Sequence, residues 1–417
     1  MVSLLPGYEA QMSEDGVAHS RDKLRSSLDS FLSVAPHPST TTLLPSTSEE
    51  SHSYRAACGF QIIRESELPS SPPSPSHDPL VYCMRNDFRP VSLQSKVFSI
   101  ANPRIQVSME LTIDFLNSLP PSHPFLEHLT SCKFVTSWDE KECFLTLSYG
   151  DAVSDSAVWE ERGAELAGLA GLTAVTARFK KTKLVVGSPD TVHDTIVVEG
   201  VPIVYEKPED AFQHPNPCTM HKALVWMFEQ MRAVAAAHPR RALNLLEMYC
   251  GCGAHTMALG KVGGPALWSK IVAVELDARL VDCCSRNIST NGLSAFVSCT
   301  KGDAGSVSKR IMRRRARLEA GGGGAAGVRP DEIADTPFDV MLVDPPRAGL
   351  DEAVINLAKT GGIEHLLYVS CGRHALVRDL GLLGDCFEVS NILLTDLFPR
   401  TDSVETLVHL KRKGTVT

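Results

Sequence analysis

The sequence predicts an α/β protein whose C-terminal half is a doubly wound, mostly parallel sheet, preceded by a smaller α+β domain. From residue 205 to 417, buried strands alternate with helices, and this rhythm is typical of parallel strands covered on both faces. Between residues 54 and 204 the apolar runs are shorter and more strand-like. Residues 1–53 are rich in Ser and Pro, so we expect one helix and an otherwise flexible segment there.

The elements of the first two parts follow from their apolar periodicity. The helix in the first part is indicated by apolar residues that fall on one helical face, namely Leu24, Leu28, Phe31 and Leu32. For the α+β domain we expect strands at 58–65, 80–87, 143–150, 172–178, 183–188 and 195–206, and helices at 108–119 and 158–172. The Pro/Ser-rich stretch 68–77 predicts a long loop between the first two strands.

The C-terminal part contains a regular series of strands and helices. The expected strands are 242–249, 270–276, 295–299, 338–344 and 365–371, closed by the pair 387–398 and 403–413. The helices between them are expected at 256–262, 278–290, 351–360 and 374–383. The Gly-rich residues 320–327 are interpreted as a flexible insertion.

Composition excludes several classes of protein. A net charge of −8 argues against a protein that coats nucleic acid through a summed positive field. The two basic clusters, 178–183 and 309–317, could bind nucleic acid locally, but each is more simply a solvated loop or helix face. The sequence has neither an apolar run of about 18 residues nor a secretory signal, so we expect a cytoplasmic or organelle-matrix protein without a membrane span.

The 12 cysteines are scattered along the chain, and none forms a CxxC pair. Only Cys250 with Cys252, and Cys283 with Cys284, lie close together in the sequence. This spacing supports neither a zinc site nor an iron–sulfur cluster, and we expect reduced thiols in a reducing compartment.

Three strand ends carry the residues expected to hold a ligand. Gly251 and Gly253 follow the first strand of the C-terminal part, and Glu275 ends the second strand 24 residues after Gly251, near the roughly 20-residue spacing of a ribose-binding acid. Without the third glycine of a dinucleotide fingerprint, this pattern looks more like an S-adenosylmethionine methyltransferase than a nicotinamide enzyme. Asp303 follows the third strand, where methyltransferases generally place an acid near the adenine. The simpler alternatives to a ligand site are that Gly251 and Gly253 form only a tight turn and that Glu275 forms only a structural salt bridge.

The next two strand ends carry an acid and a thiol. Pro345 and Pro346 cannot continue a central strand, so the chain must leave the sheet there and hold Asp344 at the rim. Cys371 ends the following strand at the same edge. A helix start and Arg373 should favour its thiolate, although a cysteine at a strand end is more often inert core.

Taken in order, the motifs at 245–253, 274–276, 343–351, 366–373 and 396–407 resemble the RNA uracil-5-methyltransferase family. The similarity extends to 7–14, 51–62, 178–183 and 209–216, and it is strongest to the branch that methylates the T-loop uridine of tRNA. The ribosomal-RNA branch usually carries cysteines for an iron–sulfur cluster, which this chain does not show. The resemblance implies a Rossmann-like methyltransferase domain with a seven-stranded sheet, dependent on S-adenosylmethionine and preceded by an RNA-binding domain.

The resemblance also implies roles for individual residues. Cys371 matches the nucleophile that adds to carbon 6 of uracil, and Glu405 matches the base that removes the proton from carbon 5. Cofactor-binding positions are matched by Tyr249, Gly251, Gly253, Glu275, Asp344, Gln213 and His214. RNA contacts are expected from Arg55, Phe60, Lys180 and Lys181. The expected partner is tRNA, with no membrane, metal or iron–sulfur cluster, and we expect a monomer.

Several positions depart from the family pattern. Gly372 and Arg373 stand where the family usually has Asn-Pro, and Ala254 stands where it has asparagine. His214 replaces a glutamine, with Gln213 displaced by one position. Two alternatives therefore stay open: a related methyltransferase that acts on ribosomal or organellar RNA, and an RNA-binding or folding helper whose chemistry has decayed.

Overall fold

A computed structural model of the 417-residue chain describes residues 16–33, 38–47, 53–68, 78–84, 91, 98, 100–188, 191–212, 214, 216–239, 241–319, 331–399, 401 and 403–414. Four of the features predicted above lie outside these residues, wholly or largely. They are the motif at 7–14, the linker at 68–77, Gln213 and the Gly-rich stretch 320–327.

The chain divides into two compact units. The large unit contains residues 1–47, 195–206 and 218–417, and the small unit contains 48–194 and 207–217. We expected boundaries at 53/54 and 204/205. The observed boundaries differ because the N-terminal segment belongs to the large unit. In addition, the chain passes from one unit to the other within each strand of a hairpin, at 194/195 and at 206/207. That hairpin consists of β8 (Thr191–Val198) and β9 (Val201–Pro208).

The large unit is built on an eight-stranded sheet in the order β1-β15-β16-β14-β13-β10-β11-β12. The strands are β1 (Thr40–Leu44), β10 (Leu243–Met248), β11 (Trp268–Glu275), β12 (Val297–Lys301), β13 (Val340–Val343), β14 (His365–Ser370), β15 (Phe387–Thr395) and β16 (Glu405–Arg412). All neighbours are parallel except that β16 runs antiparallel to β14 and β15. The doubly wound sheet is thus confirmed.

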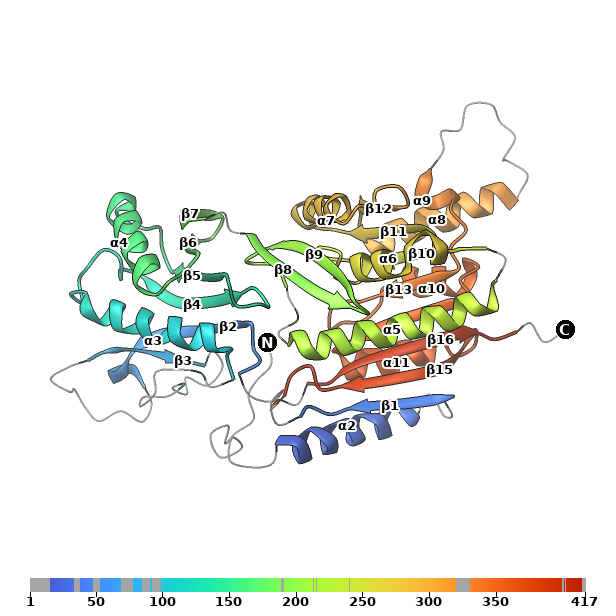
Figure 1. The fold of residues 1–417 in the computed structure, drawn as a ribbon, viewed down its shortest axis with the longest axis horizontal. Coiled ribbons are helices and arrows are strands. Elements are labelled where there is room, and N and C mark those ends of the chain that lie inside the picture. The colour runs from blue at the N-terminus through green and yellow to red at the C-terminus, as the bar shows by residue number, and fades with distance from the viewer. Residues whose placement is uncertain are drawn as a thin grey trace. The chain divides into compact units, whose positions relative to one another are not determined.

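One strand of this sheet was not predicted. The expected sheet had seven strands, and the eighth, β1, comes from the N-terminal segment that we expected to be flexible. The sequence of β1, TTTLL, combines β-branched and apolar residues that favour a strand once an edge is available to pair with. That edge is β15, and Thr40 pairs with Asn391. Figure 1 shows β1 alongside β15, with α2 next to it.

The helices of the large unit include all those expected and three that the sequence reading missed. They are α2 (Gly16–Leu32), α5 (Pro217–Ala237), α6 (Ala254–Leu267), α7 (Ala278–Thr290), α8 (Ala304–Glu319), α9 (Glu332–Asp335), α10 (Glu352–Thr360) and α11 (Arg373–Leu383). The missed helices are α5, α8 and α9. In α2, Leu24 and Phe31 are buried as predicted, whereas Leu32 lies outside the apolar face with 38% of its surface exposed.

The small unit is the expected α+β domain. Its six-stranded sheet has the order β3-β2-β4-β5-β6-β7. The strands are β2 (Ala57–Arg64), β3 (Leu80–Cys83), β4 (Leu129–Thr136), β5 (Cys143–Tyr149), β6 (Ala174–Phe179) and β7 (Thr182–Gly187), joined by the helices α3 (Pro103–Ser118) and α4 (Ser156–Leu169) and the short 3₁₀ turn η2 (Glu65–Glu67). β4 was not predicted. In the part of the chain that the structure describes, no helix is both long and apolar enough to cross a bilayer.

The topology of the large sheet determines where a ligand can bind. From β10 the chain builds β11 and β12 on one side and later β13 and β14 on the other. Open α/β sheets bind ligands beyond the carboxyl ends of the strands at such a switch point. The ends of β10, β11, β13 and β14 therefore define the edge at which the predicted site residues should meet.

Candidate functional site

The turn after β10 is held in an unusual backbone conformation. Tyr249, Gly251 and Gly253 all have positive φ angles, of 64°, 57° and 84°. A non-glycine residue with such a φ is uncommon and marks a constrained, often functional position. A Cβ at Gly251 would meet no atom within 4 Å, so the backbone there faces open space. A Cβ at Gly253 would lie 2.7 Å from the Sγ of Cys284.

Glu275 lies directly against this turn. Its carboxylate accepts hydrogen bonds from the backbone N–H of Gly251 at 3.0 Å, of Leu276 at 2.7 Å and of Asp277 at 2.9 Å. The parallel register that pairs Met248 with Val274 brings the two strand ends together. An ionised carboxylate offers about four acceptor sites, so Glu275 can hold the turn and still accept a hydrogen bond from a hydroxyl group.

Two further carboxylates flank the turn. The hydroxyl of Tyr249 donates to Asp351 at 3.3 Å, which ties the turn to the start of α10. Asp303 accepts a hydrogen bond from the N–H of Ser306 at 2.8 Å, and this backbone contact lowers the pKa of its carboxyl. Asp303 thus caps the start of α8, as residues of this type commonly do.

On the other side of the switch point, strand register brings Cys371 and Glu405 together. β14 and β16 are antiparallel, and Ser370 pairs with Thr406. The next position along each strand is therefore Cys371 opposite Glu405. Cys371 is half-buried, and Glu405 is 5% exposed. The two residues that the sequence predicted as reacting groups thus lie at one edge of the sheet.

The ionisation of this pair differs from the expectation. Burial, followed by the charge of Glu405, raises the pKa of the Cys371 thiol, although Arg347 opposes the shift. Burial and the neighbouring Asp344 raise the pKa of Glu405 well above its usual range. We expected a helix start and Arg373 to favour the thiolate. α11 does start here, but without a ligand the burial and the acidic neighbours outweigh the favourable charge.

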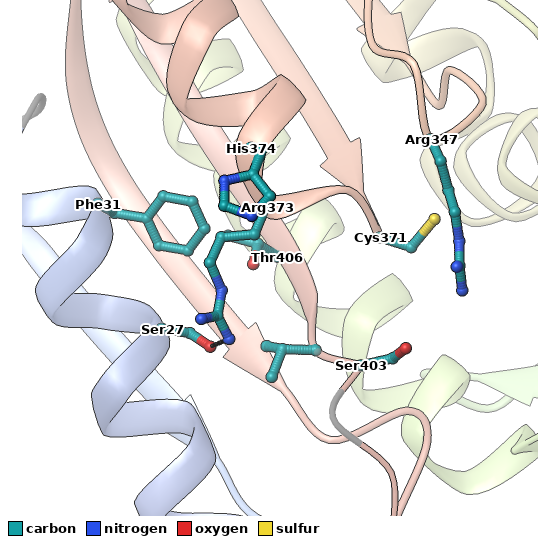
Figure 2. A pocket seen from close by; sticks show the side chains of 9 residues that line it. Ser27, Phe31, Arg347, Cys371, Arg373, His374, Ser403 and Thr406 are labelled. Carbon is teal, nitrogen blue, oxygen red and sulfur yellow. Dashed lines mark hydrogen bonds between the residues drawn. The ribbon is translucent and has the colours of Figure 1, made fainter. Parts of the chain in front are cut away.

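The cation beside the thiol is Arg347 and not Arg373. Figure 2 shows the sulfur of Cys371 directed toward Arg347. The guanidinium of Arg373 instead donates a hydrogen bond of 2.6 Å to the hydroxyl of Ser27 in α2. Arg347 directly follows Pro346 within the motif at 343–351, so the signal was present in the sequence, although we had predicted no role for this arginine.

Asp344 is half-buried and belongs to an acidic cluster that the sequence did not reveal. Burial and the charge of Glu247 raise its pKa to about 6, against the opposing effect of His255. The Nδ1 atom of His255 lies 3.6 Å from a carboxylate oxygen of Glu247. Glu247 itself is fully buried within β10 and accepts a hydrogen bond from Thr256. A glutamate inside the apolar strand LLEM was the available signal.

The segment that leads into Glu405 is held by the N-terminal helix. Lys23 of α2 forms an ion pair of 2.5 Å with Asp396. The same ammonium donates hydrogen bonds to the carbonyl oxygens of Phe398 at 3.0 Å and of Thr401 at 2.8 Å. Because Glu405 follows this segment, α2 helps to fix the position of the predicted base.

A cavity of about 250 Å³ opens beside Cys371. Its lining includes Ser27 and Phe31 from α2, Arg347, Cys371 and Thr406, as Figure 2 shows. With the other lining residues, a phenyl ring, an imidazole, three hydroxyl groups, two guanidinium groups, an isopropyl group and a thiol surround the same space. Such a lining suits a small planar molecule with polar edges.

Each of the two basic clusters has two cations in ion pairs with acidic residues. In 309–317, Arg310 pairs with Asp331 at 3.4 Å and Arg314 pairs with Asp335 at 2.6 Å. This favours the interpretation of 309–317 as a helix face. In 178–183, Arg178 and Lys183 lie near Glu209 and Asp210, with distances of 3.0 to 3.5 Å. Lys180 and Lys181 are exposed at the turn between β6 and β7.

The remaining predicted residues lie in the small unit. Arg55 is half-buried and donates a hydrogen bond of 2.9 Å to the carbonyl of Ala57. Phe60 is only 1% exposed and packs against Tyr82 and Phe98 in the core, so its burial does not support an RNA contact. His214 is buried next to Phe212.

Comparison with known proteins gives consistent results. The family described as tRNA (Uracil-5-)-methyltransferase matches residues 37–413. A tRNA/tmRNA (uracil-C(5))-methyltransferase from Marinomonas sp. is 27% identical over 81% of this chain and 89% of its own. A protein of the same name from Shewanella amazonensis is 26% identical over 86% and 88%. The Pyrococcus abyssi tRNA (uracil-54, C5)-methyltransferase, solved with S-adenosyl-L-homocysteine, shares the fold with a TM-score of 0.60 and 13% identity over 94% of this chain and 84% of its own.

Proposed function

The chain belongs to the tRNA (uracil-5-)-methyltransferase family, and from this premise we propose that it methylates carbon 5 of the T-loop uridine of tRNA through a covalent adduct with Cys371. The observation that carries the proposal is the meeting of Cys371 and Glu405 across the β14–β16 register, at the sheet edge that also carries the glycine turn. We propose S-adenosylmethionine as the methyl donor.

The residues around the glycine turn fit this cofactor. The open space at Gly251 allows a ligand to approach the backbone, and Glu275 keeps an acceptor site for a ribose hydroxyl. Tyr249 and Asp344 flank the same edge, and we assign them to cofactor binding together with Gly253. When bound, S-adenosylmethionine supplies an electrophilic methyl group. His214 and Gln213, from the small unit, remain predicted cofactor contacts.

The chemistry of uracil explains why a thiol is needed. Carbon 5 is too weak a nucleophile to accept a methyl group directly. The Cys371 thiol first loses its proton to solvent, and its sulfur then bonds to carbon 6 while the electrons of the C5–C6 double bond move toward carbon 5. Arg347, next to the sulfur, stabilises the thiolate. The activated carbon 5 then takes the methyl group.

Completion of the reaction needs a base. Carbon 5 now carries both a proton and a methyl group, and Glu405 accepts that proton as a carboxylate. The released electrons re-form the C5–C6 double bond, the bond from carbon 6 to sulfur breaks, and Cys371 leaves as a thiolate. A buried carboxylate with a raised pKa is a stronger base than an exposed one, which suits Glu405 to this step.

We further propose that the uridine leaves its folded loop to reach the thiol. A base within a stacked loop is inaccessible, so enzymes that modify it extrude it into a pocket. The cavity beside Cys371 is the candidate pocket. Lys180 and Lys181 are the exposed cations that we assign to RNA backbone contacts, with Arg55 as a further predicted contact. A monomeric state and a cytoplasmic location stay predictions.

The proposal is tested with purified protein, unmodified tRNA transcript and methyl-labelled S-adenosylmethionine. We expect label in tRNA, mapped to the T-loop uridine, and none in a transcript with cytidine at that position. A tmRNA transcript belongs in the same assay because the relatives are named for both RNAs. Label only in ribosomal or organellar RNA would instead favour the related methyltransferase. Binding of tRNA without label in any RNA would favour the decayed helper.

A further inference from the structure

Three cysteines gather beneath the glycine turn although they are far apart in the sequence. Cys250 lies in the turn itself, Cys284 in α7 and Cys299 in β12. Their sulfur atoms all lie within 4.8 Å of one another, and those of Cys250 and Cys299 are 3.9 Å apart. Cys250 and Cys284 are buried, whereas Cys299 is half-buried. All three belong to the large unit.

The fold brings these residues together through its parallel strands. The N–H of Cys250 donates to the carbonyl oxygen of Val274 in β11 at 3.1 Å, and Cys299 pairs with Ala273 of the same strand. Cys284 approaches from α7, the helix that follows β11, and its sulfur occupies the space next to Gly253. No CxxC spacing marks such a site, because each sulfur comes from a different element.

We propose that Cys250, Cys284 and Cys299 bind a thiophilic d¹⁰ metal ion, zinc in the first instance, as three thiolate ligands. Sulfur ligands of a tetrahedral zinc ion, with Zn–S bonds of about 2.3 Å, lie about 3.8 Å apart, and the sulfurs of Cys250 and Cys299 are already 3.9 Å apart. Separations of up to 4.8 Å need only a modest inward movement of the side chains. A solvent molecule reaching the half-buried side of Cys299 can fill the fourth position.

Metal binding requires the three cysteines in the thiolate form. A divalent ion forms three metal–sulfur bonds, and the protons that the sulfur atoms carried pass into solvent. The resulting site carries one net negative charge.

The proposed ion would bind next to the glycine turn and should affect its mobility. Cys250 stands between Tyr249 and Gly251, and Cys284 borders Gly253, so an ion bound to both cysteines would connect the two ends of the turn. Bound metal should therefore restrict the segment to which we assign the cofactor. This coupling rests on the proposed function, whereas metal binding itself does not.

The experiment uses the full chain, purified without oxygen, stripped with a chelator and then loaded with Zn²⁺ or Cd²⁺. After desalting, bound metal is measured by elemental analysis, and sulfur ligation is measured by the ultraviolet charge-transfer absorption of the cadmium form. We expect about one ion per chain and a strong thiolate band. In Cys299→Ser the apparent affinity should fall at least about tenfold. Cys386→Ser is the matched control, because it alters a half-buried cysteine outside the trio and should bind as the wild type does.

A stability measurement separates loss of the ligand from loss of the fold. Zn²⁺ should raise the midpoint of thermal unfolding of the wild type and of Cys386→Ser, but not that of a folded Cys299→Ser or Cys284→Ser variant. If the wild type retains no metal after desalting, or if the trio variants retain as much as the control, the inference is wrong. Failure of RNA methylation with intact metal binding would count only against the proposed function.

Discussion

The two sides of the switch point in the large sheet differ in how closely their geometry and protonation match what the proposed reaction needs. At the β10–β11 side, Glu275 already accepts three backbone hydrogen bonds and holds the glycine turn in place. At the β14–β16 side, Cys371 and Glu405 are placed by register, but burial raises the pKa of both groups, with a further rise from Glu405 at Cys371 and from Asp344 at Glu405. The cofactor side is thus preformed in shape, whereas the reacting side still needs a change in protonation, which substrates can supply.

The largest effect is expected from removal of the sulfur. Cys371→Ala should lower methyl transfer by about 10⁴-fold or more, because no other group can activate carbon 5. Binding of S-adenosylmethionine, measured by calorimetry, should stay near that of the wild type, since the glycine turn lies on the other side. Cys386→Ala is the control for general loss of a cysteine. Undiminished turnover by Cys371→Ala would remove the basis of the mechanism.

The next effect separates the two steps on the reacting side. Glu405→Gln can still allow the methyl group to be transferred, but it cannot remove the proton from carbon 5. Turnover should fall by roughly 10²- to 10⁴-fold, and a covalent protein–RNA adduct should accumulate. A denaturing gel with labelled tRNA would show this adduct as a slowly migrating band that is lost in the double variant with Cys371→Ala. Release of methylated RNA at the normal rate would show that Glu405 is not the base.

The ionisation of the reacting side predicts a pH dependence. Since the active forms are a thiolate and a carboxylate, and both pKa values are raised, the kcat/KM of methylation should rise as the pH increases above neutrality. Arg347→Gln removes the charge that lowers the pKa of Cys371, so the rise should move to higher pH. Arg373→Gln is the matched variant, because that arginine contacts Ser27, and its profile should keep its midpoint. Equal shifts of the pH profile in both variants would contradict the assignment of Arg347 as the cation that lowers the pKa of Cys371.

The smallest effect concerns the preformed side and compares its two glycines. Gly251→Ala should cost about 1–2 kcal/mol of unfolding free energy from its positive φ alone, since a Cβ there meets nothing. Gly253→Ala should cost more, because its Cβ would also press on the sulfur of Cys284 at 2.7 Å. Urea titration of both variants measures the difference. If Gly251→Ala proves the more destabilising change, the packing around the turn has been misassigned.

Local sequence patterns predicted one part of this molecule well. The alternation of strands and helices, the pairing of Gly251 with Glu275 and the placement of Cys371 at a strand end follow from periodicity and spacing, which the chain encodes within short segments. The family resemblance added Glu405, whose position opposite Cys371 depends on the antiparallel register of β16. Even so, the sequence could not reveal that the pKa values of both groups would be raised, because those shifts depend on burial in the folded state.

What the sequence missed depends on contacts between distant segments. β1 becomes a strand only because β15 offers an edge, and the cysteine trio exists only because three elements converge. α5 was overlooked although many of its apolar residues are buried, including Met220 and Phe228. Arg347 was visible in its motif, but which of two nearby arginines would face the sulfur was decided by the path of the turn after Pro346.

The pairing of β1 with β15 also sets an order of events during synthesis. Thr40 must find Asn391, a partner that the ribosome adds 351 residues later. β16, which lies inside the sheet between β14 and β15, is made last of all. The small unit, by contrast, is complete once residue 217 has emerged. We therefore expect the small unit to fold while the chain is still growing, and the first strand of the large sheet to stay unpaired until β15 has been made.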